Sequence, residues 1–122
     1  MYSDKRDQTY ARWASETEIM ESLYKIKFDG SKPEYGGIPL YAENGSVYVE
    51  KNDSHTLILG STGSKKTRLL CMPSLMLCAM AGETVVVTDP KAELYEKTYP
   101  VFKKEGYNIF VLNLRDPVQS DC

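Results

Sequence analysis

Apolar residues form short continuous runs in the second half of this chain, and longer helical patterns separate them. The runs cover 55–59, 84–88 and 108–112, and the middle run is β-branched throughout. A continuous β-branched run is typical of a strand that is buried on both faces. The stretches 66–81 and 92–105 have the pattern of helices. This alternation predicts a parallel sheet with flanking helices, which is an α/β fold.

Helix-breaking residues mark the ends of these predicted elements. Pro73 lies inside the first predicted helix, so we expect a kink or a break near Met72. Gly82 ends that helix, and Gly106 ends the second one. The two helices therefore have defined stops, and each stop precedes a predicted strand.

The first half of the chain predicts one helix and one hairpin. Residues 14–24 have a helical pattern, and Ser15–Glu18 has the spacing of a capping box. Trp13 is expected to pack against this helix as a hydrophobic staple. Asn44-Gly45 is a strong two-residue turn signal, and it lies between two strand-like runs. We therefore expect a β-hairpin over 38–50.

Composition and charge limit the function classes. The chain has 122 residues, which indicates one domain, and a net charge of −2, which gives no electrostatic footprint for nucleic acid. No apolar run has membrane-spanning length, so we expect a cytoplasmic chain without direct membrane contact. The three cysteines form no C-x-x-C pair, which disfavours a disulfide framework and a cysteine metal centre.

One segment between the first predicted strand and its helix carries candidate chemistry. It fits the phosphate-binding loop G-x-x-x-x-G-K-[ST] except at one position. The segment consists of Gly60, Ser61, Thr62, Gly63, Ser64, Lys65, Lys66 and Thr67. In such loops backbone N–H groups and the helix N-terminus hold phosphate, and a lysine adds a cation. We predict that Lys66 contacts phosphate and that Thr67 is the metal ligand, binding Mg²⁺ through its hydroxyl.

Lys65 stands where this motif has its second glycine. If the backbone there needs a positive φ, a lysine adds strain of about 1–2 kcal/mol. Its side chain also stands where the backbone should lie against the phosphates. We therefore expect a weakened phosphate or nucleotide site. The alternative is that 60–67 is only a polar turn between a strand and a helix.

Asp89 and Lys91 form a second candidate element after the strand 84–88. They follow the carboxyl end of that strand, which is the edge where ligands of open α/β sheets bind. One interpretation makes both residues neighbours of the phosphates. The other makes Asp89 a helix N-cap and Pro90 the first helical residue, and the residues alone favour this second interpretation.

The order of these segments resembles type IV secretion coupling proteins, the TraG/TraD-like ATPases of conjugation. The resemblance rests on the loop, on Asp89-Pro90-Lys91 followed by Glu93-Leu94-Tyr95, and on 111–117, and it runs through most of the chain. It implies a RecA-like hexameric motor at the inner membrane. Such a motor uses ATP and Mg²⁺ to feed single-stranded DNA, bound by a relaxase, into a secretion channel.

This resemblance also implies residue roles, partners and domains. The loop residues, Asp89 and Lys91 would bind nucleotide, and single-stranded DNA, the relaxosome and the secretion channel would be partners. The implied fold is a partial P-loop NTPase of RecA-like type, with Walker A at the loop. Residues 1–35 would form an N-terminal helix and linker, and 36–122 a β-hairpin plus a truncated P-loop domain.

Departures from the family pattern shape the functional expectation. Lys65 and Ala92 replace glycines, and no Walker B strand, catalytic glutamate or arginine finger follows. We expect part of a coupling ATPase that is inactive alone and has no catalytic residue. The alternative is a small non-enzymatic α/β protein-interaction module; a self-sufficient small NTPase is disfavoured, because the acidic strand is missing. Missing neighbour strands leave open edges, which predicts a homodimer.

Overall fold

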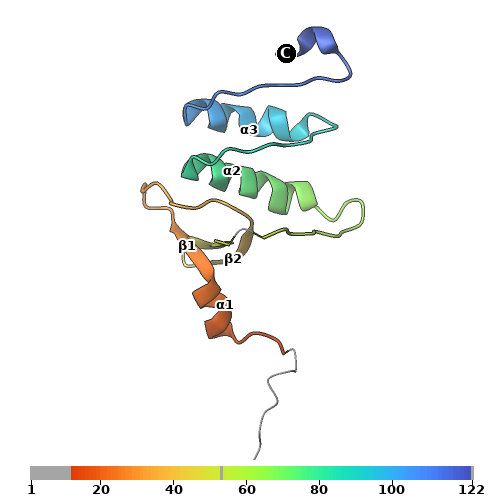
Figure 1. Cartoon of the computed structure of the whole chain (residues 1–122). Coiled ribbons are helices and arrows are strands. Elements are labelled where there is room, and N and C mark those ends of the chain that lie inside the picture. Colours follow the sequence, from red (N-terminus) through yellow and green to blue (C-terminus); the bar gives the residue numbers. More distant parts are fainter. Residues whose placement is uncertain (1–11, 53, 122) are drawn as a thin grey trace, which may run out of the picture.

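The computed structural model describes residues 12–52 and 54–121, and the tail 1–11 and Cys122 lie outside these ranges. Figure 1 shows the elements following one another along an elongated molecule, from α1 at one end to the C-terminal turn at the other. The helices and strands are α1 (Glu16–Ser22), β1 (Leu23–Lys27), β2 (Pro39–Glu43), β3 (Ser46–Glu50), the π-helix η1 (Thr67–Cys71), α2 (Met72–Ala81), α3 (Glu93–Lys104) and the 3₁₀-helix η2 (Pro117–Gln119).

The sheet of the described residues is antiparallel and has the strand order β1-β3-β2. β2 and β3 form the predicted hairpin, which is confirmed. Asn44 and Gly45 both have positive φ, the backbone shape that a two-residue turn of this kind requires. Tyr41 and Tyr48 lie opposite each other, with ring centroids 5.7 Å apart. This aromatic pair favours the observed register.

The first helix is shorter than the sequence pattern predicts. The capping box of Ser15 and Glu18 is present, so the predicted helix start is confirmed. The helix ends at Ser22, and the following residues form β1, a strand that the sequence analysis did not predict. The expectation for Trp13 is wrong, because its side chain is almost fully exposed. Pairing with β3 therefore overrides the local helical pattern at Leu23 and Tyr24.

The core lies between this sheet and α2. Ile26 and Val49 are the largest fully buried side chains, and Leu77 of α2 packs against them. Register explains the arrangement: Ile26 lies opposite Val47 and Tyr24 opposite Val49, so all four side chains share one face of the sheet. The pairing of β1 with β3 therefore joins the first part of the chain to α2.

The break predicted near Met72 is confirmed. The chain forms a π-helix over Thr67–Cys71 and becomes α-helical from Met72. Pro73 lacks an N–H and crowds the carbonyl four residues earlier, which explains the wider turn before it. Gly82 then caps α2 with a left-handed φ of 82°, as predicted.

Two contacts fix the C-terminal end of α2. The Tyr107 hydroxyl lies within hydrogen-bonding distance of the carbonyls of Cys78, Ala79 and Glu83, at 3.1, 3.4 and 3.0 Å. The Glu83 carboxylate accepts a hydrogen bond from the Gly36 amide at 2.7 Å. Burial, with Glu83 close by, raises the pKa of the Cys78 thiol to about 11. This end of the helix therefore joins residues from three separate parts of the chain.

The parallel sheet expected from 55–59, 84–88 and 108–112 is not formed among the described residues. These segments are extended but have no strand pairing, and the sheet that does form is antiparallel and comes from the first half. Figure 1 shows the three segments running in one direction, with α2 and α3 returning between them. The predicted chain path is therefore present, whereas the hydrogen bonds between strands are absent. Among the described residues no backbone hydrogen bond joins 55–59 or 84–88 to another segment, so no ladder forms.

Replacement of Gly36 by alanine is expected to destabilise the protein. A Cβ at this position would lie 2.5 Å from the Cys78 Cα, which is backbone and cannot turn aside. We expect Gly36→Ala to lower the free energy of unfolding by about 1–3 kcal/mol, measured by urea denaturation.

Gly30→Ala is the matched control, because a Cβ at Gly30 meets nothing within 4 Å. The φ of Gly30 is +88°, so this control loses roughly 1 kcal/mol from backbone strain alone. Equal stability of the Gly36→Ala variant and the natural protein would contradict the close approach of the two backbones.

Candidate functional site

The candidate loop 60–67 lies where the extended segment 55–59 turns back into η1 and α2 (Figure 1). The Ser64 amide donates to the Ser61 carbonyl at 3.2 Å, so the loop contains a tight turn. Gly63 has φ 84°, which glycine adopts without strain. Residues 60–65 are exposed. The loop is therefore a compact and accessible connection between an extended segment and a helix.

The Lys66 ammonium lies inside this loop. It donates hydrogen bonds to the carbonyl of Gly60, to the carbonyl of Ser61 at 3.0 Å and to the hydroxyl of Ser64 at 3.2 Å. A Cβ at Gly60 would lie 2.6 Å from the Ser64 hydroxyl oxygen, so a side chain there would displace the Ser64 and Lys66 side chains. The loop is thus folded around its own cation.

Lys65 and Ala92 share an unusual backbone conformation. Their φ angles are 60° and 59°, and Asn44 is the other non-glycine residue with positive φ in the described part of the chain. Asparagine tolerates this conformation, whereas lysine and alanine are strained in it by about 1–2 kcal/mol each. The conditional strain predicted for Lys65 is therefore confirmed. Both positions have the backbone shape that glycine adopts most easily.

Asp89 acts at the start of α3, although not as the predicted N-cap. Its carboxylate accepts a hydrogen bond from the Tyr95 amide at 2.9 Å. The helix begins at Glu93 and the cap position is Ala92, so the placement of Pro90 as the first helical residue is wrong. The left-handed turn at Ala92 redirects the chain, which moves the helix start three residues beyond Pro90. Asp89 still satisfies one N–H of the first turn.

The structure assembles only part of the predicted site. The loop residues lie together, and Figure 1 shows the turn at 89–92 on the same side of the elongated molecule as the loop. Within the described ranges, however, no hydrogen bond or ion pair joins Asp89 or Lys91 to the loop. Lys91 is exposed. In the described part of the chain these two residues therefore have no polar bond to the loop.

The loop has the donor set that a phosphate group needs. The first N–H groups of a helix have no partner within that helix, and here they follow a loop that carries an ammonium. A phosphate oxygen would replace the carbonyls as the partner of Lys66. The fit to Mg²⁺ is poorer, because residues 12–52 and 54–121 contain no cluster of three or more His, Cys, Asp or Glu side chains. Thr67 offers one hydroxyl, so phosphate oxygens and water would supply the other ligands.

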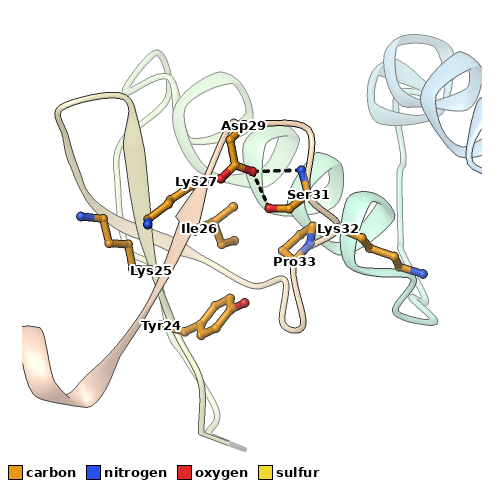
Figure 2. Close-up of a pocket in the computed structure, with 8 residues that line it drawn as sticks. All are labelled: Tyr24, Lys25, Ile26, Lys27, Asp29, Ser31, Lys32 and Pro33. Atoms are coloured by element: carbon orange, nitrogen blue, oxygen red, sulfur yellow. Dashed lines mark hydrogen bonds between the residues drawn. The ribbon is translucent and has the colours of Figure 1, made fainter.

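A hollow that the sequence analysis missed lies beside β1 (Figure 2). Its volume is about 280 Å³, and its lining residues are Tyr24, Lys25, Ile26, Lys27, Asp29, Ser31, Lys32 and Pro33. The Asp29 carboxylate accepts hydrogen bonds from the hydroxyl and the amide of Ser31, which lowers the pKa of Asp29. This carboxylate is therefore engaged within its own turn. The Asp-x-Ser spacing in the linker is the one sequence signal that indicates such a turn.

Glycine at either strained position is expected to stabilise the protein. Lys65→Gly and Ala92→Gly each remove the cost of a Cβ at positive φ and add flexibility to the unfolded chain. We expect each variant to raise the free energy of unfolding by several tenths of a kcal/mol to about 1 kcal/mol, measured by thermal and urea denaturation.

Two controls separate this strain from other effects. Lys65→Ala removes the charge and keeps the Cβ, so its stability should stay close to that of the natural chain. Asn44→Gly relieves a residue that already tolerates positive φ, so it should gain least. A loss of stability in both glycine variants would contradict the strain.

Comparison with protein families gives one match. A family model described as type IV secretory system conjugative DNA transfer matches residues 5–122. Comparisons with curated proteins and with solved structures found no match for this chain. Among the described residues, no helix is both long and apolar enough to span a bilayer.

Proposed function

The chain belongs to the type IV secretory system conjugative DNA transfer family, and on this premise we propose that its loop 60–67 binds the phosphates of a nucleotide weakly. Membership of the family involves the chain in conjugative DNA transfer. The nucleotide site is the finer step, and the ligand by family resemblance is ATP with Mg²⁺. The single observation that carries it is the loop folded around the Lys66 ammonium.

The backbone of the loop supports this proposal. Lys65 occupies the position where the phosphate-loop motif has glycine, and its φ is 60°. The same holds for Ala92, which replaces the glycine of the family's second segment and has φ 59°. Two non-glycine residues with positive φ at the two positions where the family has glycine are explained if these turns keep the backbone conformation of the family. The strain supports a loop backbone in the conformation that glycine adopts most easily, with side chains at positions where the family has glycine.

The proposed site binds without hydrolysing. Lys66 would contact phosphate oxygens and Thr67 would offer its hydroxyl to Mg²⁺. Hydrolysis also needs a carboxylate that holds the metal or orients water. Asp89 accepts a hydrogen bond from the Tyr95 amide at the start of α3, and within the described ranges it makes no hydrogen bond or ion pair to the loop. We therefore propose a role in holding nucleotide, with hydrolysis depending on residues that do not come from this stretch of chain.

The fold proposal is a RecA-like arrangement of 55–59, 84–88 and 108–112. The one-directional path of these segments with helices between them supports it (Figure 1). In this proposal the segments become strands once neighbouring strands pair with them. By family resemblance the transferred substrate is single-stranded DNA, and the relaxosome and the secretion channel are partners at the inner membrane.

Binding of Mg·ATP tests the proposed site. The natural chain should bind weakly in titration calorimetry, because the Lys65 side chain crowds the phosphates and Lys66 must leave its carbonyl partners. Lys65→Gly should bind roughly tenfold tighter, and Lys66→Met should lose binding by roughly tenfold or more. None of these proteins should release phosphate.

Lys27→Met is the matched control, because it removes an exposed lysine of β1 that lies far along the chain from the loop. Its affinity should equal that of the natural chain. The site is wrong if Lys66→Met binds as the natural protein does, or if Lys65→Gly brings no gain.

A protein-interaction module is the second candidate function. One observation favours it: large apolar side chains of the extended segments, such as Leu59, Val86 and Leu114, are strongly exposed. Exposed apolar surface of this kind marks sites of association.

A further inference from the structure

Exposed lysines and one exposed phenylalanine gather where β1 passes into the linker that follows it. Lys25 and Lys27 are exposed on β1, and Lys32 is exposed in the linker. Phe28 lies between these lysines in the chain and is 56% exposed. Within the described residues none of the three lysines forms an ion pair. The segment 25–33 therefore presents positive charge around an exposed aromatic side chain.

Nearby carboxylates offset this positive charge only in part. Asp29 accepts hydrogen bonds from the hydroxyl and the amide of Ser31, so its charge is held within its own turn. Glu105 directly follows the last turn of α3, which is basic. The ranges 25–33 and 103–105 together contain five lysines and two carboxylates. Positive charge therefore prevails here, although the whole chain has a net charge of −2.

These two ranges lie on one side of the molecule. Figure 1 shows the linker after β1 and the C-terminal ends of α2 and α3 on the side opposite the loop 60–67. A second hollow, of about 300 Å³, joins the three parts, and its lining includes Phe28 and Pro33 of the linker, Met80 of α2 and Glu105. Lysines of the segment 25–33 also line it. The hollow is thus an apolar recess bordered by positive charge.

The directions of the lysine side chains favour a broad anionic partner over a single small anion. Figure 2 shows Lys25 and Lys27 extending to one side of β1, whereas Lys32 extends away from them on the other side of the linker. A Cβ at Gly82 would lie 2.8 Å from the Lys32 Nζ, so this ammonium lies beside the C-terminal end of α2. Lysines that spread apart in this way do not converge on one phosphate. They suit a surface on which each meets a different anionic group.

We propose that the segment 25–33 docks this chain onto the surface of an anionic lipid bilayer, with its lysines at the headgroups and Phe28 inserted at the interface. Each lysine close to an anionic membrane improves affinity about fivefold. An exposed aromatic ring gains from entering the boundary between headgroups and acyl chains. The phosphates of a nucleic acid would also engage the lysines, but they offer no apolar phase to Phe28. The exposed ring therefore favours the bilayer.

This contact replaces the sequence-based expectation of a chain without direct membrane contact. Its residues all lie inside the described ranges, so it does not depend on where the chain begins or ends. It is also independent of the proposed nucleotide site, which lies on the opposite side of the molecule (Figure 1).

Co-sedimentation of the full chain with lipid vesicles tests the docking. The natural protein should bind vesicles of equal parts phosphatidylglycerol and phosphatidylcholine, and far less to vesicles of phosphatidylcholine alone. Lys27→Gln should weaken binding about fivefold, and Phe28→Ser roughly tenfold. Added salt should weaken binding of the natural protein, because it screens the lysines.

Two matched controls test whether the effect is local. Lys91→Gln removes an exposed lysine from the turn 89–92 on the opposite side (Figure 1), and Val118→Ser removes an apolar side chain that is 93% exposed in η2. Both variants should bind vesicles as the natural protein does. Because Lys27 and Phe28 are exposed, their variants should also keep the natural free energy of unfolding in urea denaturation.

Three results would overturn the docking. The first is a natural protein that does not sediment with the anionic vesicles. The second is binding that Lys27→Gln and Phe28→Ser both leave unchanged. The third is binding to a DNA duplex in place of the vesicles, with equal affinity for the natural protein and Phe28→Ser, since this assigns the lysines to nucleic acid.

Discussion

The packing of α2 against the small sheet is the constraint on which the rest of this structure depends. Leu77 enters the face formed by Ile26 and Val49, and at Gly36 the backbone approaches the helix so closely that no side chain fits. The same helix end receives the Tyr107 hydroxyl from beyond α3. One helix therefore positions the sheet before it and the extended segments after it. It also sets where the loop at its start must turn.

The candidate site follows from how this helix begins. Pro73 prevents a regular α-helix from reaching back to the loop, so the first turn is a wider π-turn that starts at Thr67. Lys66 lies immediately before it and folds back onto the carbonyls of Gly60 and Ser61. The loop is thus held by its own cation. An anion that bound there would compete with these carbonyls for the Lys66 ammonium.

Strained turns and unpaired extended segments occur next to each other in this structure. Lys65 and Ala92 keep a backbone shape suited to glycine, at the two turns that follow extended segments. Those segments keep a one-directional path while they lack strand neighbours. Local geometry has thus been retained where the interactions that usually accompany it are absent. The chain belongs to the type IV secretory system conjugative DNA transfer family.

The sequence alone determined the features that depend on neighbouring residues. Asn44-Gly45 specified the hairpin, Pro73 the break before α2, and Gly82 the end of that helix, because each acts through its own backbone angles. Only the tertiary structure decided which extended segments pair. Leu23 and Tyr24 belong to the predicted helix yet pair with β3, and the β-branched run 84–88 reads as a strand yet has no strand partner among the described residues. A strand needs a neighbour within hydrogen-bonding distance, and no local pattern contains that neighbour.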